Sequence, residues 1–187
     1  NELRAIQQQV GITFIYITHD QGEALTMSDR IAVMSDGVIQ QVSDGKNVYD
    51  HPDTPFVASF VGENNPFAGK VTSADSSFAV IETAHGALRG RNPKGLNAGE
   101  KAILVVRPES FLLGEGAPDA TIHAETLSSA FEGNATHVFL KGATSKDITV
   151  TVGRHGGAKI PQQGERAAIH YAPEMGIMLP EGKLARE

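Results

Sequence analysis

The chain has 187 residues, of which 40% are hydrophobic, and a formal net charge of −6. This length admits one large domain or two small ones, and the acidic balance argues against a protein that binds nucleic acid or an anionic membrane through bulk charge. The absence of cysteine excludes disulfides and cysteine-ligated metal sites, and no apolar run is long enough to cross a membrane.

The first segment has apolar residues at helical spacing. Leu3, Ile6 and Val10 recur every three or four residues and are followed by Gly11, which predicts a helix that ends at this glycine. The pattern starts at Asn1 without a capping residue or an initiator methionine. We therefore expect the sequence to be part of a longer protein.

The next segment predicts a corner between a strand and a helix. Residues 13–18 form an apolar, β-branched run, typical of a buried strand in a parallel sheet. His19 follows the strand at the end where open α/β sheets bind ligands. Asp20 and Glu23 form a capping-box pattern, with Asp20 capping a helix over 21–27. His19 is therefore a candidate phosphate contact; a half-buried structural imidazole is the alternative.

Short elements follow up to residue 62. Residues 31–34 and 38–42 predict two strands joined at an Asp-Gly hairpin turn. Ser43 is expected to cap a helix that runs through Tyr49, and Pro55 is expected to start another short helix that ends at Gly62. Residues 1–62 hold three Lys and Arg against eight Asp and Glu, whereas residues 63–187 are almost balanced, so we place a domain boundary here.

From Pro66 onward the pattern is that of an all-β domain. Short alternating apolar runs are separated by Gly, Pro and Asn, which favours a small barrel or sandwich. The predicted strands are 68–72, 78–83, 87–91, 101–107, 121–131, 136–140, 148–152, 167–171 and 176–179.

Two stretches of this β region match each other. Residues 99–109 and 164–174 both read G-E-[K/R]-A, then a strand, then Pro-Glu, at an offset of 65 residues. A shared turn, strand and exit predict two related β units, of about 67–115 and 119–180. A chance match of two short stretches is the alternative.

The run H-D-Q-G-E-A-L-T-M-S-D-R-I at 19–31 resembles the switch-histidine region of ABC transporter ATPase subunits, most of all importers of the spermidine/putrescine type. Arg107-Pro108-Glu109 and the two β units resemble the TOBE domain of these importers. The resemblance implies an α/β remnant of an ABC ATPase domain at 1–62, followed by an all-β tandem OB-like (TOBE) domain at 63–187.

The same resemblance implies a function for the complete subunit. It would use ATP and Mg²⁺ to drive solute uptake, with polyamine the expected solute, and His19 would be both catalytic and cofactor-binding through the γ-phosphate. The implied partners are a second ATPase subunit in a homodimer, which the β domain would help to form, and transmembrane permease subunits. The implied location is the cytoplasmic face of the bacterial inner membrane, peripheral and without direct insertion.

The chain alone is expected to be inactive and to bind no cofactor. Its sequence has no G-x-x-x-x-G-K-[S/T] phosphate loop, no LSGGQ-like signature and no apolar strand that ends in Asp-Glu. No metal site is expected, because four histidines of the β region, His123, His137, His155 and His170, are scattered without metal-ligand spacing.

Two other functions are weighed against the ATPase interpretation. The first is a binding module in which tandem OB-like units capture a small oxyanion or another effector. The second, nucleic-acid binding through OB-like barrels, is disfavoured because it needs a basic groove with stacking aromatic residues. Aromatic residues make up only 6% of the chain, and its β half is close to neutral.

Overall fold

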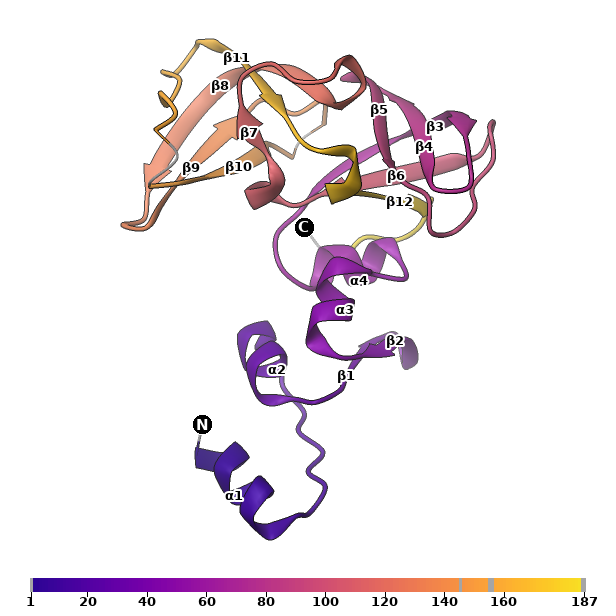
Figure 1. Ribbon diagram of the computed structural model, residues 1–187, viewed down its shortest axis with the longest axis vertical. Helices are drawn as coiled ribbons and strands as arrows, with labels where there is room; N and C mark the ends of the chain where they lie inside the picture. Colours follow the sequence, from indigo (N-terminus) through magenta and orange to yellow (C-terminus); the bar gives the residue numbers. More distant parts are fainter. Residues whose placement is uncertain (1, 145, 155–156, 186–187) are drawn as a thin grey trace. The chain divides into compact units, whose positions relative to one another are not determined.

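The computed structural model describes residues 2–144, 146–154 and 157–185, which divide into two compact units. The described residues up to Gly62, together with Leu184 and Ala185, form unit 1, and Glu63–Lys183 form unit 2 (Figure 1). No helix in the described part of the chain is long and apolar enough to span a membrane.

Unit 1 contains four short helices and one β-hairpin. The helices are α1 (Glu2–Val10), α2 (Gln21–Met27), α3 (Gly45–Asp50) and α4 (Pro55–Phe60), and the hairpin strands are β1 (Ile31–Ser35) and β2 (Val38–Ser43). Asp36 and Gly37 form the hairpin turn with φ of +52° and +77°, as a two-residue turn of this kind requires. The predicted hairpin is therefore confirmed.

The helix caps of unit 1 confirm one prediction and correct another. Thr54 caps α4 by accepting a hydrogen bond from the N–H of Val57 at 3.2 Å, and Pro55 is the first helical residue, as predicted. The predicted cap of α3 is wrong, because Ser43 is the last residue of β2. Asp44 caps α3 instead by accepting from the N–H of Asn47 at 2.9 Å, and this bond lowers the pKa of Asp44.

The strand predicted over 13–18 is wrong in the structure of this chain. Residues 12–18 have no assigned strand or helix, and the side chains of Ile15 and Ile17 are 91% and 93% exposed. A strand forms only where neighbouring strands take up its N–H and C=O groups and cover its apolar faces. No described strand pairs with this segment.

Unit 2 is all β, as predicted, and each of the nine predicted strands is present. A closed barrel has the strand order β12-β5-β4-β3-β6, and a second, five-stranded sheet has the order β10-β9-β8-β11-β7 (Figure 1). The bounds are β3 Asn65–Ala74, β4 Phe78–Thr83, β5 Gly86–Arg91, β6 Lys101–Val106, β7 Leu112–Leu113, β8 Thr121–Phe131, β9 Ala135–Leu140, β10 Ile148–Gly153, β11 Arg166–His170 and β12 Gly176–Pro180, with 3₁₀ turns η1 Pro108–Ser110, η2 Pro118–Ala120 and η3 Pro173–Met175.

The repeat seen in the sequence is a structural repeat. Gly99 and Gly164 both adopt positive φ, of +96° and +81°. The N–H of Gly99 donates to the carbonyl of Val71, and the N–H of Gly164 donates to the carbonyl of Thr126, each at 2.8 Å. β3 pairs with β4, and β8 pairs with β9. The register of each pair shifts immediately after the acceptor residue, which is Val71 in β3 and Thr126 in β8. The two halves of unit 2 are therefore built alike.

Each half contributes its last strand to the other half. After η1, β7 pairs with β11 of the second sheet, and after η3, β12 pairs with β6 of the barrel. The pairs Leu113–Ile169 and Met178–Leu104 are equivalent under the offset of 65. The expected grouping into 67–115 and 119–180 is corrected accordingly, because β12 closes the first barrel and β7 belongs to the second sheet. One continuous apolar core joins the two halves.

The repeat leads to a prediction about Thr126. This residue is 1% exposed, and its hydroxyl has no hydrogen-bond partner among the described residues, whereas the equivalent residue of the other half is Val71. Removing a buried hydroxyl without a partner is expected to stabilise a protein. We therefore expect Thr126→Val to raise the free energy of unfolding by about 1 kcal/mol in urea denaturation, and Val71→Thr to lower it. A loss of stability in Thr126→Val would contradict the prediction.

Candidate functional site

His19 lies exposed between the extended segment and α2. Its side chain makes no hydrogen bond or ion pair with any other described residue. The backbone on either side is held, because the hydroxyl of Thr18 accepts from the N–H of Asp20 at 2.9 Å and donates to the carboxylate of Glu23 at 3.0 Å. The bend is therefore fixed while the imidazole is left available to a ligand.

The two carboxylates of the corner both hold it in place. The carboxylate of Asp20 accepts from the N–H of Glu23 at 2.9 Å, which confirms the predicted helix cap. The carboxylate of Glu23 bonds Thr18 and the hydroxyl of Tyr16, at 2.9 Å for the latter, rather than returning to Asp20. This hydrogen bond to Glu23 raises the pKa of Tyr16. A partial capping box thus anchors the end of the extended segment on α2.

Two further side chains fix the corner within unit 1. The side-chain oxygen of Gln21 accepts from the N–H of Gly62 at 2.7 Å, which ties α2 to the residue that follows α4. The guanidinium of Arg4 in α1 donates to the carbonyl of Thr26 at 3.0 Å and to Asp29 at 3.3 Å. The motif residue Gln21 therefore has a structural partner, in contrast to His19.

Large apolar side chains are exposed along α1 and the extended segment. Their exposed fractions are about one half or more for Leu3, Ile6, Val10, Ile12, Phe14, Ile15, Tyr16 and Ile17. Exposed apolar surface of this extent is typical of a region that packs against another protein segment.

The described residues include an exposed imidazole at His19 and no cluster of metal-ligating side chains. His19 can hydrogen-bond a terminal phosphate, but the sequence contains no phosphate loop to hold a nucleotide. No described group of three or more His, Asp or Glu side chains is placed to hold a metal ion. The sequence therefore lacks the loop that would hold a whole nucleotide.

The histidines of unit 2 have local partners. His123 contacts Glu115 at 2.9 Å, His137 contacts Glu132 at 3.2 Å, and the Nδ1 atom of His170 contacts the carbonyl of Gly114 at 3.0 Å. His155 lies outside the described residues. Each of these three histidines therefore has a structural explanation.

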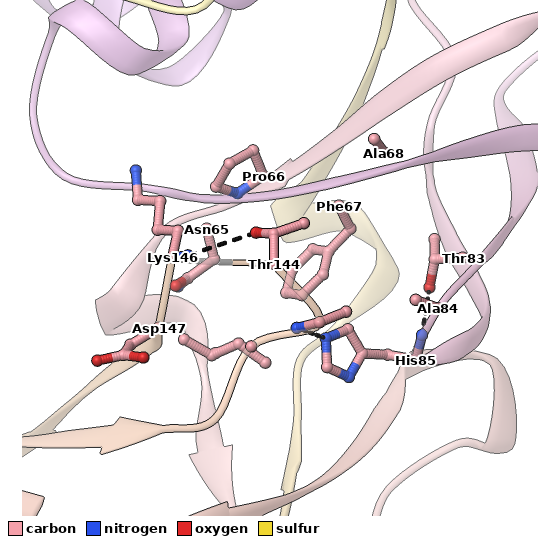
Figure 2. Close-up of a pocket in the computed structure, with 13 residues that line it drawn as sticks. Asn65, Pro66, Phe67, Ala68, Thr83, Ala84, His85, Thr144, Lys146 and Asp147 are labelled. Atoms are coloured by element: carbon pink, nitrogen blue, oxygen red, sulfur yellow. Dashed lines mark hydrogen bonds between the residues drawn. The ribbon is translucent and has the colours of Figure 1, made fainter. Parts of the chain in front are cut away.

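Unit 2 also contains a small pocket that sequence reasoning missed. It has a volume of about 80 Å³ and lies between β3, the β4–β5 turn and the β9–β10 loop (Figure 2). Its lining includes Thr83 at the end of β4, His85 from the turn, Phe67 from β3, and Lys146 and Asp147 from the loop. Pockets for drug-sized ligands are several times larger, so this one suits water or a small ion. Its residues come from three separate segments without a shared motif.

Two side chains that line this pocket make hydrogen bonds to the other half of unit 2. Asn65 in β3 is 2% exposed, and its amide both accepts from the N–H and donates to the carbonyl of Thr149 in β10, each at 2.8 Å. The Nε2 atom of His85 accepts from the N–H of Ala143 at 3.1 Å. The pocket wall is therefore held by hydrogen bonds between segments distant in the sequence.

Comparison with known proteins gives a consistent result. A model of the TOBE domain matches residues 104–179. The chain is 46% identical to the spermidine/putrescine import ATP-binding protein PotA of Rubrobacter xylanophilus, over 75% of this chain and 38% of the relative. It is 34% identical to PotA of Thermobifida fusca and 36% identical to PotA 1 of Pseudomonas aeruginosa, over 96% and 95% of this chain and 48% of each relative. The chain thus spans less than half the length of these relatives.

Among solved structures, the chain resembles the cytoplasmic molybdate-binding protein ModG with molybdate bound. The TM-score is 0.53 and the identity 18%, over 62% of this chain and 96% of that chain. At this identity the likeness shows the fold alone, and it agrees with the β architecture of unit 2.

Proposed function

Because this chain is a homologue of spermidine/putrescine import ATP-binding proteins over most of its length and contains a TOBE domain, we propose that it forms the switch-histidine end and the TOBE domain of an ABC importer ATPase subunit. The observation that supports this most is His19, which is exposed and has no structural partner although the corner around it is tightly bonded. A histidine kept for packing would be covered or hydrogen-bonded.

In the complete subunit, His19 contacts the γ-phosphate of ATP. The neutral imidazole presents one N–H donor and one acceptor nitrogen, so it can bond a phosphate oxygen and a water molecule. Asp20, Glu23 and Thr18 act as positioning residues, because their hydrogen bonds fix the backbone on both sides of the ring. ATP supplies the phosphoryl group, and the remaining ATPase groups belong to parts of the subunit outside this chain.

The exposed apolar segments pack against the rest of the ATPase domain. Residues 13–18 there form a strand of its sheet, as their composition predicts. Two observations support this arrangement. Ile15 and Ile17 are more than 90% exposed in this chain, and the relatives are more than twice as long as the part of them that it matches.

The complete subunit couples the binding and hydrolysis of Mg-ATP to uptake of a solute, and the names of the relatives favour polyamine. It works as a homodimer with contacts from unit 2 and docks on transmembrane permease subunits. It is peripheral, at the cytoplasmic face of the bacterial inner membrane, and nucleic acid is not among its partners.

A phosphate-release assay tests this assignment. We expect Mg²⁺-dependent ATP turnover from the complete subunit and none from the 187-residue chain alone, because the chain lacks the phosphate loop and the catalytic carboxylate. The control is His19→Ala in the same chain, which separates its own activity from that of a contaminant. Mg²⁺-dependent turnover by the chain that disappears in His19→Ala would contradict the proposal.

A second candidate function is capture of a small oxyanion by unit 2. It is favoured by the pocket of about 80 Å³ beside Lys146 and by the fold shared with ModG, a molybdate-binding protein. Titration calorimetry with molybdate and sulfate separates the two candidates. Saturable heat that disappears in Lys146→Ala would favour an oxyanion site.

A further inference from the structure

We propose that His85 is a proton-sensitive tie between the two halves of unit 2. In its neutral form it holds Ala143, in the segment that follows β9, against the β4–β5 turn, and its protonation releases Ala143 from the turn. This inference concerns unit 2 alone and does not depend on the ATPase assignment.

The hydrogen bond that makes the tie requires a neutral ring. The Nε2 atom of His85 faces the backbone N–H of Ala143 at 3.1 Å, and only an unprotonated nitrogen can accept from that donor. The proton of the neutral ring therefore sits on Nδ1. Protonation of Nε2 would place two N–H groups against each other. The hydrogen bond from Ala143 therefore cannot form when the ring is charged.

The ring is held in position from its own turn and from β3. The backbone N–H of His85 donates to the hydroxyl of Thr83 at 3.1 Å, and this hydroxyl donates to the carbonyl of Gly86 at 2.8 Å. The ring meets that of Phe67 edge to face, with centroids 5.8 Å apart and an interplanar angle of 88° (Figure 2). Loss of this contact therefore releases Ala143 rather than the histidine.

The surroundings of His85 favour its neutral form. The ring is partly buried, and burial lowers the pKa of His85 below its ordinary value of 6.5. The charged groups that line the pocket are Lys146 and Asp147, both from the β9–β10 loop. The described lining residues from β3 and from the β4–β5 turn carry no other charge or titratable group, and none of the described residues forms an ion pair with His85.

Other histidines of unit 2 respond to protonation in the opposite way. His123 and His137 face carboxylates, and His170 faces a carbonyl oxygen, so a proton on the ring strengthens or preserves each contact. His85 is the one described histidine of unit 2 whose ring nitrogen accepts from a backbone N–H. A fall in pH therefore weakens this contact selectively.

The direction of the pH dependence follows from linkage. The released state binds a proton near the ordinary pKa of 6.5, and the tied state binds it only at a lower pH because burial opposes the charge. The tie is therefore intact above pH 6.5. As pH falls from there through the lowered pKa, the equilibrium constant for release rises by up to about tenfold per pH unit.

Nuclear magnetic resonance on the 187-residue chain tests the proposal. The readouts are the titration of the His85 ring and the protection factor of the Ala143 amide against hydrogen exchange, between about pH 4.5 and pH 7.5. We expect Ala143 to lose protection with the same midpoint as His85, below pH 6.5. Protection of Ala143 that is independent of pH while His85 titrates would overturn the proposal.

Matched variants separate the tie from general destabilisation. His85→Gln keeps an acceptor near the Nε2 position and cannot titrate, so it should keep Ala143 protected at every pH tested. His85→Phe removes the acceptor and should leave Ala143 unprotected throughout. His123→Phe, the control, should leave the transition of Ala143 unchanged. A transition that persists in His85→Gln would contradict the tie, and the wild-type titration decides alone if His85→Phe does not fold.

Discussion

Replacing His19 by alanine in an ATP-binding subunit that contains this chain is expected to lower the kcat of ATP hydrolysis by about 10²–10³-fold. The Kd for ATP is expected to change by less than about threefold, because most binding energy comes from backbone groups and cations that grip the phosphates elsewhere in the subunit. Steady-state phosphate release at saturating ATP measures kcat, and equilibrium titration with a fluorescent nucleotide measures Kd.

The matched control for this variant is His51→Ala. His51 is exposed at the end of α3, in the same unit as His19 but outside the switch-histidine motif. Its replacement is expected to leave kcat within about twofold, because it lies outside the switch-histidine motif and most substitutions of exposed residues have small effects. Hydrolysis that is nearly normal in His19→Ala, or equally impaired in His51→Ala, would count against the role of His19.

Replacing Asn65 by alanine is expected to lower the free energy of unfolding of unit 2 by about 2–4 kcal/mol. The buried amide makes two hydrogen bonds of 2.8 Å to the backbone of Thr149, at an edge of the five-stranded sheet. Without it, the N–H and the carbonyl of Thr149 lose their partner. Urea denaturation followed by the near-ultraviolet signal of buried Tyr171 measures the loss, because Tyr171 lies in the shared core.

Two further variants make the Asn65 test specific. Asn65→Asp keeps an acceptor for the N–H of Thr149 but sets a buried carboxylate against its carbonyl, so it should destabilise at least as much. Asn134→Ala changes an exposed asparagine in the β8–β9 turn and should shift stability by less than about 0.5 kcal/mol. Equal effects of Asn65→Ala and Asn134→Ala would show that the two hydrogen bonds between Asn65 and Thr149 contribute nothing to stability.

The elements that sequence reasoning predicted correctly are those with a local physical signal. Asp36-Gly37 predicts its hairpin because both residues adopt positive φ readily, and Pro55 predicts a helix start because its fixed φ suits the first turn. The cap of α3 was misplaced by one residue. Ser43 and Asp44 are both good caps, and the pairing of Ser43 with Ile31 in the hairpin decides between them.

The errors of prediction concern partners that are distant in the sequence. The run at 13–18 has the composition of a strand, but pairing depends on neighbours that the described residues do not supply. The exchange of β7 and β12 was missed because Leu112–Leu113 is too short to show alternation. Only the register of β7 with Ile169 reveals where it belongs.

The two candidate sites also differ in whether a local signal in the sequence marks them. His19 was found from the sequence because it lies within a contiguous motif that resembles a known family. The contact between His85 and Ala143 was not found, because it joins residues 58 positions apart and involves a backbone donor. A backbone N–H is present at almost every residue, so its use as a partner leaves no trace in the sequence.

The most direct test of the proposed function is a structure of the complete subunit with Mg²⁺ and a non-hydrolysable ATP analogue. The proposal predicts a ring nitrogen of His19 within about 3 Å of an oxygen of the γ-phosphate, with residues 13–18 paired as a strand behind it. An imidazole directed away from the nucleotide, with the segment at 13–18 still unpaired, would contradict it.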